Sequence, residues 1–289
     1  MKKIKILFIL VLLLLIVPSV TFANDPKDSI PAPPGTNVLL FYYDHISGTD
    51  AYSNGDKVSN STDFNANIAM LRYTYYGQVG KYPWALTGIL PYGDMSIDIP
   101  NNKKYSASQI GDPIIAGVFW PYANPEKKTW VEFTQYIIPP LGEYTHDKPL
   151  CIQMGSNRWS FKEELAIVKG FGPFMIELLG FAQFFTDNDE YTRADLTLEK
   201  DNIYHGEAHL IWDVNKTLFL SADYFYDHGG ETSAAGISNN DELDDHTAGI
   251  TVGLHLTPST LLLLKARDTF KSENCITTKD IGIRLAYFF

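Results

Sequence analysis

The sequence predicts an all-β fold, a transmembrane, up-and-down antiparallel β-barrel of about twelve strands. Three observations predict it: the ending of the chain, the alternation of short and long connections, and an export signal followed by no second long apolar run. In the last nine residues, Ile281, Ile283, Leu285 and Tyr287 recur at every second position before the final Phe289. Period two is typical of a strand with one apolar face. Such a terminal strand exposes an edge unless it pairs, and closure of a barrel removes that edge.

The composition agrees with a membrane barrel and excludes one large class of partner. The chain has 289 residues, of which 34 are acidic and 23 basic, so its formal net charge is −11. Nucleic-acid binders need a basic footprint, so we expect no nucleic-acid partner. Hydrophobic residues make up 45% and aromatic residues 13% of the chain. The strands of a membrane barrel have middling hydropathy because one of their faces is polar.

The N-terminus has the three parts of a secretory signal peptide, which we place at residues 1–23. Three lysines lie in the first five residues, an unbroken apolar run covers 6–17, and a small-residue exit ends at Ala23. The apolar run is shorter than the roughly 20 residues of a spanning helix. We therefore expect cleavage after Ala23, a mature chain that starts at Asn24, and membrane residence through strands in a bacterial outer membrane.

Residues 24–36 form a Pro-rich lead segment ahead of the barrel, which we assign to residues 37–289. The segment contains Pro26, Pro31, Pro33 and Pro34. Proline lacks a backbone N–H, so this stretch cannot be a helix or a central strand. We expect it to start on the periplasmic side, to occupy the lumen and to limit flow.

The rest of the chain divides into runs with the alternation of strands. They are expected at about 37–45, 64–76, 83–92, 110–120, 129–138, 158–168, 173–186, 202–212, 217–227, 246–256, 260–270 and 281–289. Five of their connections are tight turns, and these alternate with longer polar loops. Outer-membrane barrels have short periplasmic turns and long extracellular loops in this arrangement.

Four of the five tryptophans lie beside the short turns: Trp84, Trp120, Trp130 and Trp212. Only Trp159 lies at the opposite end of its strand. Tryptophan is enriched at membrane–water interfaces. The four residues therefore predict an aromatic girdle at the inner interface.

Charged residues within the strands are expected to face the lumen. An Arg or Lys on the lipid face at mid-depth costs about 2–4 kcal/mol, so the inward assignment is favoured. The assigned residues are Arg72, Lys265, Arg267 and Arg284 on one wall, and Glu132, Glu177, Glu207, His209 and Asp223 on the other. They predict a polar pathway between two oppositely charged walls. The alternative is a packed interior of paired charges that conducts nothing, since twelve strands lie between filled and open barrel sizes.

His205, Glu207 and His209 lie at spacing two and therefore point the same way in a strand. This pattern is compatible with a metal or acid–base cluster, or with a hydrogen-bonded interior network. No Ser-His-acid order or phosphate-binding glycine loop occurs, so we expect no catalytic residues, no metal and no cofactor.

The two cysteines, Cys151 and Cys275, fall in predicted outer loops. An exported location permits a disulfide between them. Their strands lie roughly opposite each other, so a disulfide would require the 139–157 loop to fold across the mouth of the barrel.

Several short stretches occur together along nearly the whole mature chain. They are Pro33-Pro34-Gly35-Thr36-Asn37, Leu90-Pro91-Tyr92-Gly93-Asp94, Gly111-Asp112-Pro113, Pro140-Leu141-Gly142-Glu143-Tyr144, Gly155-Ser156-Asn157-Arg158-Trp159-Ser160, Tyr204-His205-Gly206-Glu207-Ala208-His209-Leu210 and Gly229-Gly230-Glu231-Thr232. In their order and spacing the chain resembles the outer-membrane family described as "Putative MetA-pathway of phenol degradation". The resemblance implies a transporter-like barrel channel and implies no catalytic residues.

These expectations combine into a channel or facilitator for the passive passage of small aromatic or hydrophobic molecules, and not an enzyme. The alternatives are an outer-membrane lipid hydrolase, or a plugged structural barrel or adhesin. The expected partners are the small-molecule solute, the lipid and lipopolysaccharide of the outer membrane, and the barrel-assembly machinery that reads the strand ending at Phe289.

Overall fold

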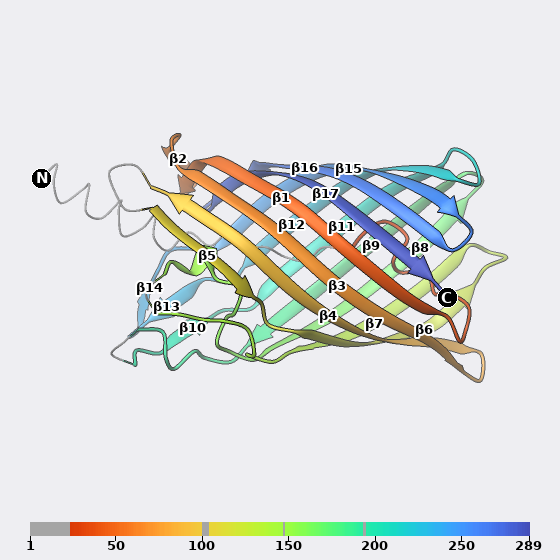
Figure 1. Cartoon of the computed structure of the whole chain (residues 1–289), viewed down its shortest axis with the longest axis horizontal. Helices are drawn as coiled ribbons and strands as arrows, with labels where there is room; N and C mark the ends of the chain where they lie inside the picture. The colour runs from red at the N-terminus through yellow and green to blue at the C-terminus, as the bar shows by residue number, and fades with distance from the viewer. Residues whose placement is uncertain (1–23, 100–103, 147, 193–194) are drawn as a thin grey trace, which may run out of the picture.

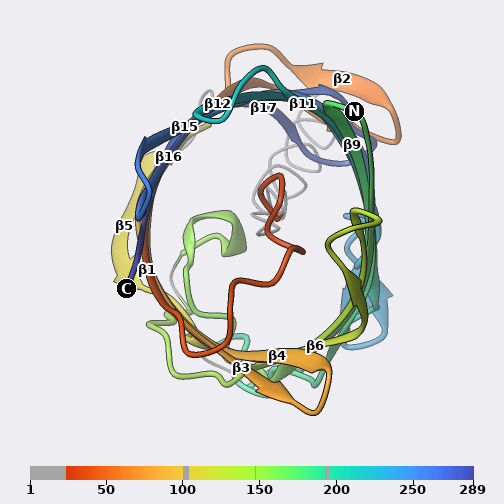
Figure 2. The same ribbon diagram turned by 90° about the vertical axis from the view of Figure 1, so that its right-hand side faces the viewer.

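The computed structural model describes residues 24–99, 104–146, 148–192 and 195–289, so the expected signal peptide lies outside the described residues. Twelve antiparallel strands form a closed barrel (Figures 1 and 2). They are β1 (Asn37–Ser53), β3 (Asp63–Val79), β4 (Tyr82–Asp98), β6 (Ile114–Asn124), β7 (Thr129–Ile138), β8 (Ser160–Phe171), β9 (Phe174–Phe185), β11 (Ile203–Asp213), β12 (Leu218–Gly229), β15 (Leu243–Thr257), β16 (Thr260–Lys271) and β17 (Ile276–Phe288). The predicted fold class is confirmed.

The chain closes on itself at its last residue. β17 pairs with β1 in a register that places Phe288 opposite Val38. The Asn37 amide donates to the Phe289 carbonyl at 2.8 Å, and the Phe289 amide donates back at 2.9 Å. The terminal edge that the sequence left open is therefore paired, as closure predicts. Five short connections, at 80–81, 125–128, 172–173, 214–217 and 258–259, lie at this periplasmic end.

The strand expected at 110–120 is interrupted. β5 (Lys104–Ile110) pairs with the outer half of β4, and β6 pairs with the inner half. Between them the Gly111 amide donates to the Pro91 carbonyl at 2.9 Å, and a Cβ on Gly111 would lie 2.8 Å from the Pro91 ring. Pro113 has no amide hydrogen to continue the ladder. The strand therefore breaks at 111–113.

The outer loops contain further ordered elements that the sequence pattern did not predict. β2 (Asp56–Ser59) folds back on β1, and β10 (Leu198–Lys200), β13 (Thr232–Ala234) and β14 (Ile237–Ser238) form a separate three-stranded sheet. A single 3₁₀ turn, η1 (Leu150–Ile152), lies in the loop between β7 and β8. No helix in the described ranges is long and apolar enough to cross a membrane.

The described interior of the barrel has three apolar zones, of which two lie near its ends and the third consists of Ala166, Leu179, Phe181, Ile203 and Leu243. The periplasmic collar consists of Val38, Leu40, Tyr42, Ala85, Val118, Trp120, Trp130, Val168, Met175, Ile211, Phe219, Leu261, Leu263 and Ala286. The outer cluster consists of Ala51, Phe64, Ala66, Ile68, Met95, Ile97, Ile99, Ala107, Cys151, Ile152, Cys275 and Ile276. The charged residues of the strands lie between these zones.

The predicted tryptophan girdle is half wrong. Trp84 and Trp212 lie on the outer face, but Trp120 and Trp130 are only 1% and 7% exposed and belong to the periplasmic collar. The alternation explains the difference, because Trp120 is in phase with the buried Val118. Trp130 is likewise two residues from the inward Glu132.

Candidate functional site: a plugged lumen

The lead segment lies inside the barrel, where Figure 2 shows it crossing the lumen. It forms a β-turn in which the Asp28 amide donates to the Asp25 carbonyl at 3.1 Å. Pro26 occupies the second position and Lys27 the third, with φ of 75°. Glycine is the usual residue at that φ, and another residue there costs about 1–3 kcal/mol unless its surroundings hold it. The barrel supplies these surroundings, since the Lys27 amide donates to Glu177 Oε2 at 2.8 Å.

The basic wall receives both carboxylates of this turn. Arg284 Nη1 lies 2.6 Å from Asp28 Oδ1 and 3.1 Å from Asp25 Oδ2. Lys265 and Arg267 approach Asp25 Oδ1 at 3.3 and 3.4 Å.

Arg72 completes this set, because its Nη1 lies 3.1 Å from Asp28 Oδ2. Burial alone would raise the pKa of Asp25, but Lys265, Arg284 and Arg267 hold it well below its usual range. All four basic residues assigned to the lumen therefore bind the lead segment.

The acidic wall binds the backbone of the same segment. Glu177 accepts hydrogen bonds from the amides of Lys27, at 2.8 Å, and of Ser29, at 3.3 Å. Glu207 accepts one from the Asn24 nitrogen at 3.0 Å. The lead segment thus bridges two opposed walls, with its carboxylates on one and its N–H groups on the other.

Glu132 and Asp223 also face the interior, but their hydrogen bonds are to the barrel itself. Glu132 accepts a hydrogen bond from Thr134 Oγ1 at 2.7 Å. Asp223 accepts one from Thr251 Oγ1 at 2.7 Å. Both are buried in the interior, as the alternation assigned them.

His205, Glu207 and His209 form the hydrogen-bonded network that was one of the two interpretations. His205 Nδ1 lies 2.8 Å from Asp227 Oδ1 and its Nε2 lies 2.9 Å from Glu207 Oε1. His209 Nε2 lies 3.0 Å from Glu207 Oε2 and its Nδ1 lies 2.8 Å from Asp223 Oδ1. Both nitrogens of each ring are engaged by carboxylates, so neither imidazole activates a serine. Within the described ranges no group of three or more His, Cys, Asp or Glu side chains is arranged to hold a metal ion.

The periplasmic collar also binds the lead segment, through a hydrogen bond and an apolar contact that the sequence analysis did not predict. Trp120 Nε1 donates to the Ser29 carbonyl at 2.8 Å, and Ile30 packs against the periplasmic collar. The signal was available in the phase of Trp120 with Val118. That phase places an indole N–H in the interior, where it needs an acceptor.

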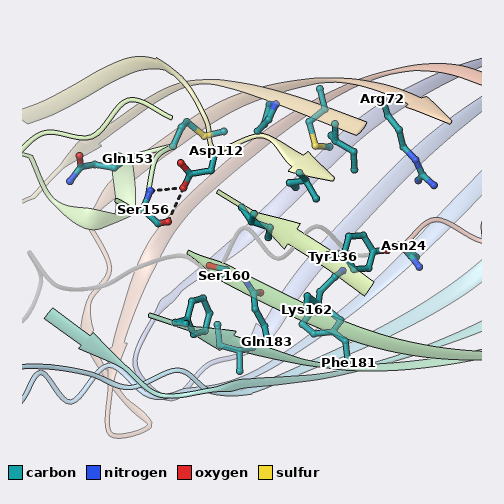
Figure 3. A pocket seen from close by; sticks show the side chains of 18 of the residues that line it. Asn24, Arg72, Asp112, Tyr136, Gln153, Ser156, Ser160, Lys162, Phe181 and Gln183 are labelled. Carbon is teal, nitrogen blue, oxygen red and sulfur yellow. Dashed lines mark hydrogen bonds between the residues drawn. The ribbon is translucent and has the colours of Figure 1, made fainter. Parts of the chain in front are cut away.

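A cavity of about 270 Å³ lies between the lead segment and the loop 139–157 (Figure 3). Its apolar lining includes Met70, Met95, Met154, Ile114, Phe181 and Phe185. Polar groups reach it from Lys162 and Gln183, and the lead segment contributes Asn24, Asp25 and Asp28.

Lys162 is one of three cationic residues that line this cavity, with Arg72 and Lys200. Its Nζ lies 3.0 Å from Glu164 Oε2, 3.9 Å from the ring centroid of Tyr136 and 4.4 Å from that of Phe181. The ammonium group of Lys162 therefore contacts one carboxylate and the faces of two aromatic rings. The ring contacts have the geometry of cation–π interactions.

Asp112 holds the loop 139–157 in the mouth of the barrel. Its carboxylate accepts a hydrogen bond from the Gly142 amide at 2.8 Å. It accepts two more from Ser156, from the amide at 2.8 Å and from Oγ at 2.7 Å (Figure 3). A Cβ on Gly142 would lie 2.5 Å from the Asp112 nitrogen, so only glycine permits this approach. Three of the short motifs singled out in the sequence therefore meet at one carboxylate.

The loop folds inward as the disulfide hypothesis required, and Cys151 and Cys275 are both buried in the outer cluster. The disulfide between them stays a prediction. Burial raises the pKa of the Cys151 thiol to about 12. Thiol–disulfide exchange needs a thiolate, which such a site disfavours.

The barrel, its plug and its motifs can now be compared with known proteins. The family model described as "Putative MetA-pathway of phenol degradation" matches residues 47–285. The chain belongs to this family. None of the curated proteins searched matches the chain.

Among solved structures, this family member is similar to the COG4313 outer membrane channel from Pseudomonas putida F1. The TM-score is 0.88 at 24% identity, covering 92% of this chain and all of the other. The transport unit of the autotransporter AIDA-I from Escherichia coli is less similar, with a TM-score of 0.52 at 11% identity over 96% of each chain. The family member therefore has the fold of bacterial outer-membrane barrels.

Proposed function

We propose that the protein is a channel for the passive passage of small aromatic or hydrophobic molecules that carry a polar end. The observation that carries this proposal is the cavity above the lead segment, whose lining combines apolar side chains with polar and charged ones. Ligand sites for small molecules commonly combine an apolar wall with a few placed polar groups that fix orientation. The family description, which names phenol degradation, supports a solute of this chemistry.

Lys162 and Gln183 are the groups suited to orient the polar end of such a solute. Both line the cavity beside Phe181. A phenolic hydroxyl could accept from the ammonium and donate to the amide, while its ring contacts Phe181 and the methionines. A larger alkyl chain would find the same apolar surface.

Passage from this cavity to the periplasm requires the lead segment to move. Below the cavity the segment is bound to both charged walls and to the periplasmic collar. We infer that it acts as a plug, which is displaced or rearranged as a solute passes.

Deletion of residues 25–34 tests the proposal, because no strand is removed. Single-channel recordings in planar bilayers and uptake of phenol into liposomes should both rise relative to the full mature chain. In the deleted background, neutralising Arg267 and Arg284 together should shift ion selectivity towards cations, since the acidic wall remains. If the deleted barrel folds but neither conducts nor takes up phenol, the plugged structural barrel becomes the better interpretation.

The membrane partners are proposed on the outer face of the barrel. Phe289 is 59% exposed and its ring stacks on Tyr287 with centroids 5.6 Å apart. We propose that the barrel-assembly machinery reads this aromatic end, while lipid and lipopolysaccharide contact the apolar strand faces. Removal of Phe289 should lower the yield of heat-modifiable barrel far more than removal of the loop residue Asn240.

A further inference from the structure

The nitrogen of Asn24 occupies an unusual position for a backbone atom. It lies 3.0 Å from Glu207 Oε1, and the Asn24 side-chain amide donates to Glu164 Oε1 at 2.8 Å. Glu207 and Glu164 are only 4% and 2% exposed. They project from β11 and β8 on the acidic wall, so Asn24 touches two buried carboxylates at once.

The acidic wall has more negative than positive groups. Its buried carboxylates include Glu132, Glu164, Glu177, Glu207 and Asp223. Among the described residues, the cationic side chains hydrogen-bonded to these five are Lys162 and, if protonated, His205 and His209. These five carboxylates outnumber the three cationic side chains even with both imidazoles charged, and Glu132 and Glu177 are the two whose described hydrogen bonds come from neutral donors. Buried charges without a partner are costly, so a further cation at this wall would be stabilising.

We propose that proteolytic cleavage of the Ala23–Asn24 bond supplies this cation and completes the plug. One water is consumed, the C–N bond breaks, Ala23 keeps a carboxylate, and Asn24 becomes an α-ammonium. That ammonium forms a buried ion pair with Glu207, beside Glu164. The mature N-terminus is thus a ligand of the lumen, and export processing is coupled to closure of the channel.

Cleavage gives the Asn24 nitrogen the positive charge that the acidic wall favours. In an uncleaved chain it is a peptide nitrogen with one hydrogen and no charge. After cleavage it has three hydrogens and a positive charge, and charge-assisted hydrogen bonds are about twice as strong as neutral ones. The segment is then held at its first residue by the acidic wall and at Asp25 and Asp28 by the basic wall.

The first test uses protein purified from outer membranes. Mass spectrometry should find Asn24 as the N-terminal residue. Cyanate, which carbamylates uncharged amines, should modify Asn24 about tenfold more slowly, or slower still, in the folded barrel than in the heat-unfolded chain. A different N-terminus, or equal rates in both states, would overturn the proposal.

The second test compares refolded chains. One begins at Asn24 and the other carries Gly-Ser before it, which moves the ammonium away and leaves a peptide nitrogen in its place. Glu207→Gln and Glu164→Gln are compared with Glu163→Gln, an exposed neighbour on β8. The extended chain and the Glu207→Gln barrel should each lose the tenfold protection, whereas Glu163→Gln should keep it. Because the extended chain alters no barrel residue, it remains informative if Glu207→Gln fails to fold.

Cyanate protection does not depend on transport, so its outcome is independent of the proposed channel function. Protection without phenol uptake would leave the N-terminal ion pair intact and remove only the channel. Phenol uptake with an unprotected Asn24 would keep the channel and remove the ion pair.

Discussion

Replacing Asp25 with Asn is expected to unseat the plug. The carboxylate is 2% exposed and lies within 3.1–3.4 Å of Arg284, Lys265 and Arg267. Asparagine keeps the shape of the side chain but not its charge, so three interior cations lose a counterion. Removing one partner from a buried ion pair costs about 3–5 kcal/mol, because the remaining charge is left uncompensated.

This cost converts into a large shift of population. A free-energy change of about 1.4 kcal/mol alters an equilibrium tenfold, so the ratio of seated to displaced plug should fall by about 150- to 4,000-fold. Asp28 still holds Arg72 and Arg284, so the segment stays tethered rather than lost. The barrel keeps all its strands, and the variant should still show a heat-dependent shift on gels.

Single-channel recording of the wild type and of Asp25→Asn provides the assay, with Asp56→Asn as the control. Asp56 is exposed on β2 and does not contact the plug. Asp25→Asn should open in long events, whereas the control should record as wild type. A variant that stays closed while the 25–34 deletion conducts would refute the energetic argument for Asp25.

Mild acid gives a related expectation for the same carboxylate. The pKa of Asp25 in the folded chain lies below its unfolded value, so its stabilising effect is present above the unfolded pKa. It is lost only as pH falls through the depressed folded value. The wild-type plug should therefore remain seated at about pH 4, where an ordinary Asp is half protonated.

Three further predictions concern the outer half of the barrel. Asp112→Ala removes the acceptor of the Gly142 and Ser156 hydrogen bonds, each worth about 1.5–3 kcal/mol to a charged group, so limited proteolysis should cut within 139–157. Cys151, with its thiol pKa raised to about 12 by burial, should react with maleimide at pH 8 only after heating in detergent; rapid labelling of the native barrel would contradict its burial. Burial and Arg158 lower the pKa of Lys200 to about 8, so the unfolded chain binds more protons above that pH. The thermal midpoint should then rise from pH 8 to 10, and Lys200→Met should flatten the rise.

The barrel was predictable from the sequence because its signals are local and repeated. Alternation within one strand identifies its faces, and the outward Tyr224 beside the inward Asp223 is one of many such pairs. Short turns fix which strands are neighbours. The prediction failed at Trp120 and Trp130, where we followed the preference of tryptophan for membrane interfaces. The alternation of strand residues places both side chains in the interior instead.

The candidate site was predictable only in part, because its contacts are distant in sequence. The alternation placed Arg284 and Glu177 in the lumen, and the prolines excluded the lead segment from the wall. No local pattern indicates that Asp25 meets Arg284, from which it is separated by most of the chain. The same holds for Asp112, whose partners lie in a loop without periodicity.

The separation of charge around the barrel explains why a short segment can close it. A lumen with evenly mixed charges would pair them with each other across its strands and leave a plug little to bind. Here the basic residues lie on β3, β16 and β17 and the acidic ones on β7, β8, β9, β11 and β12. Pairs within a wall, such as Lys265 with Asp44 of β1 at 3.2 Å, compensate part of this charge, and a partner from outside the wall can bind the rest. A turn with two carboxylates on one side and backbone N–H groups on the other satisfies both walls. We propose that the same two walls, once the turn is displaced, leave a polar path for a small amphipathic solute.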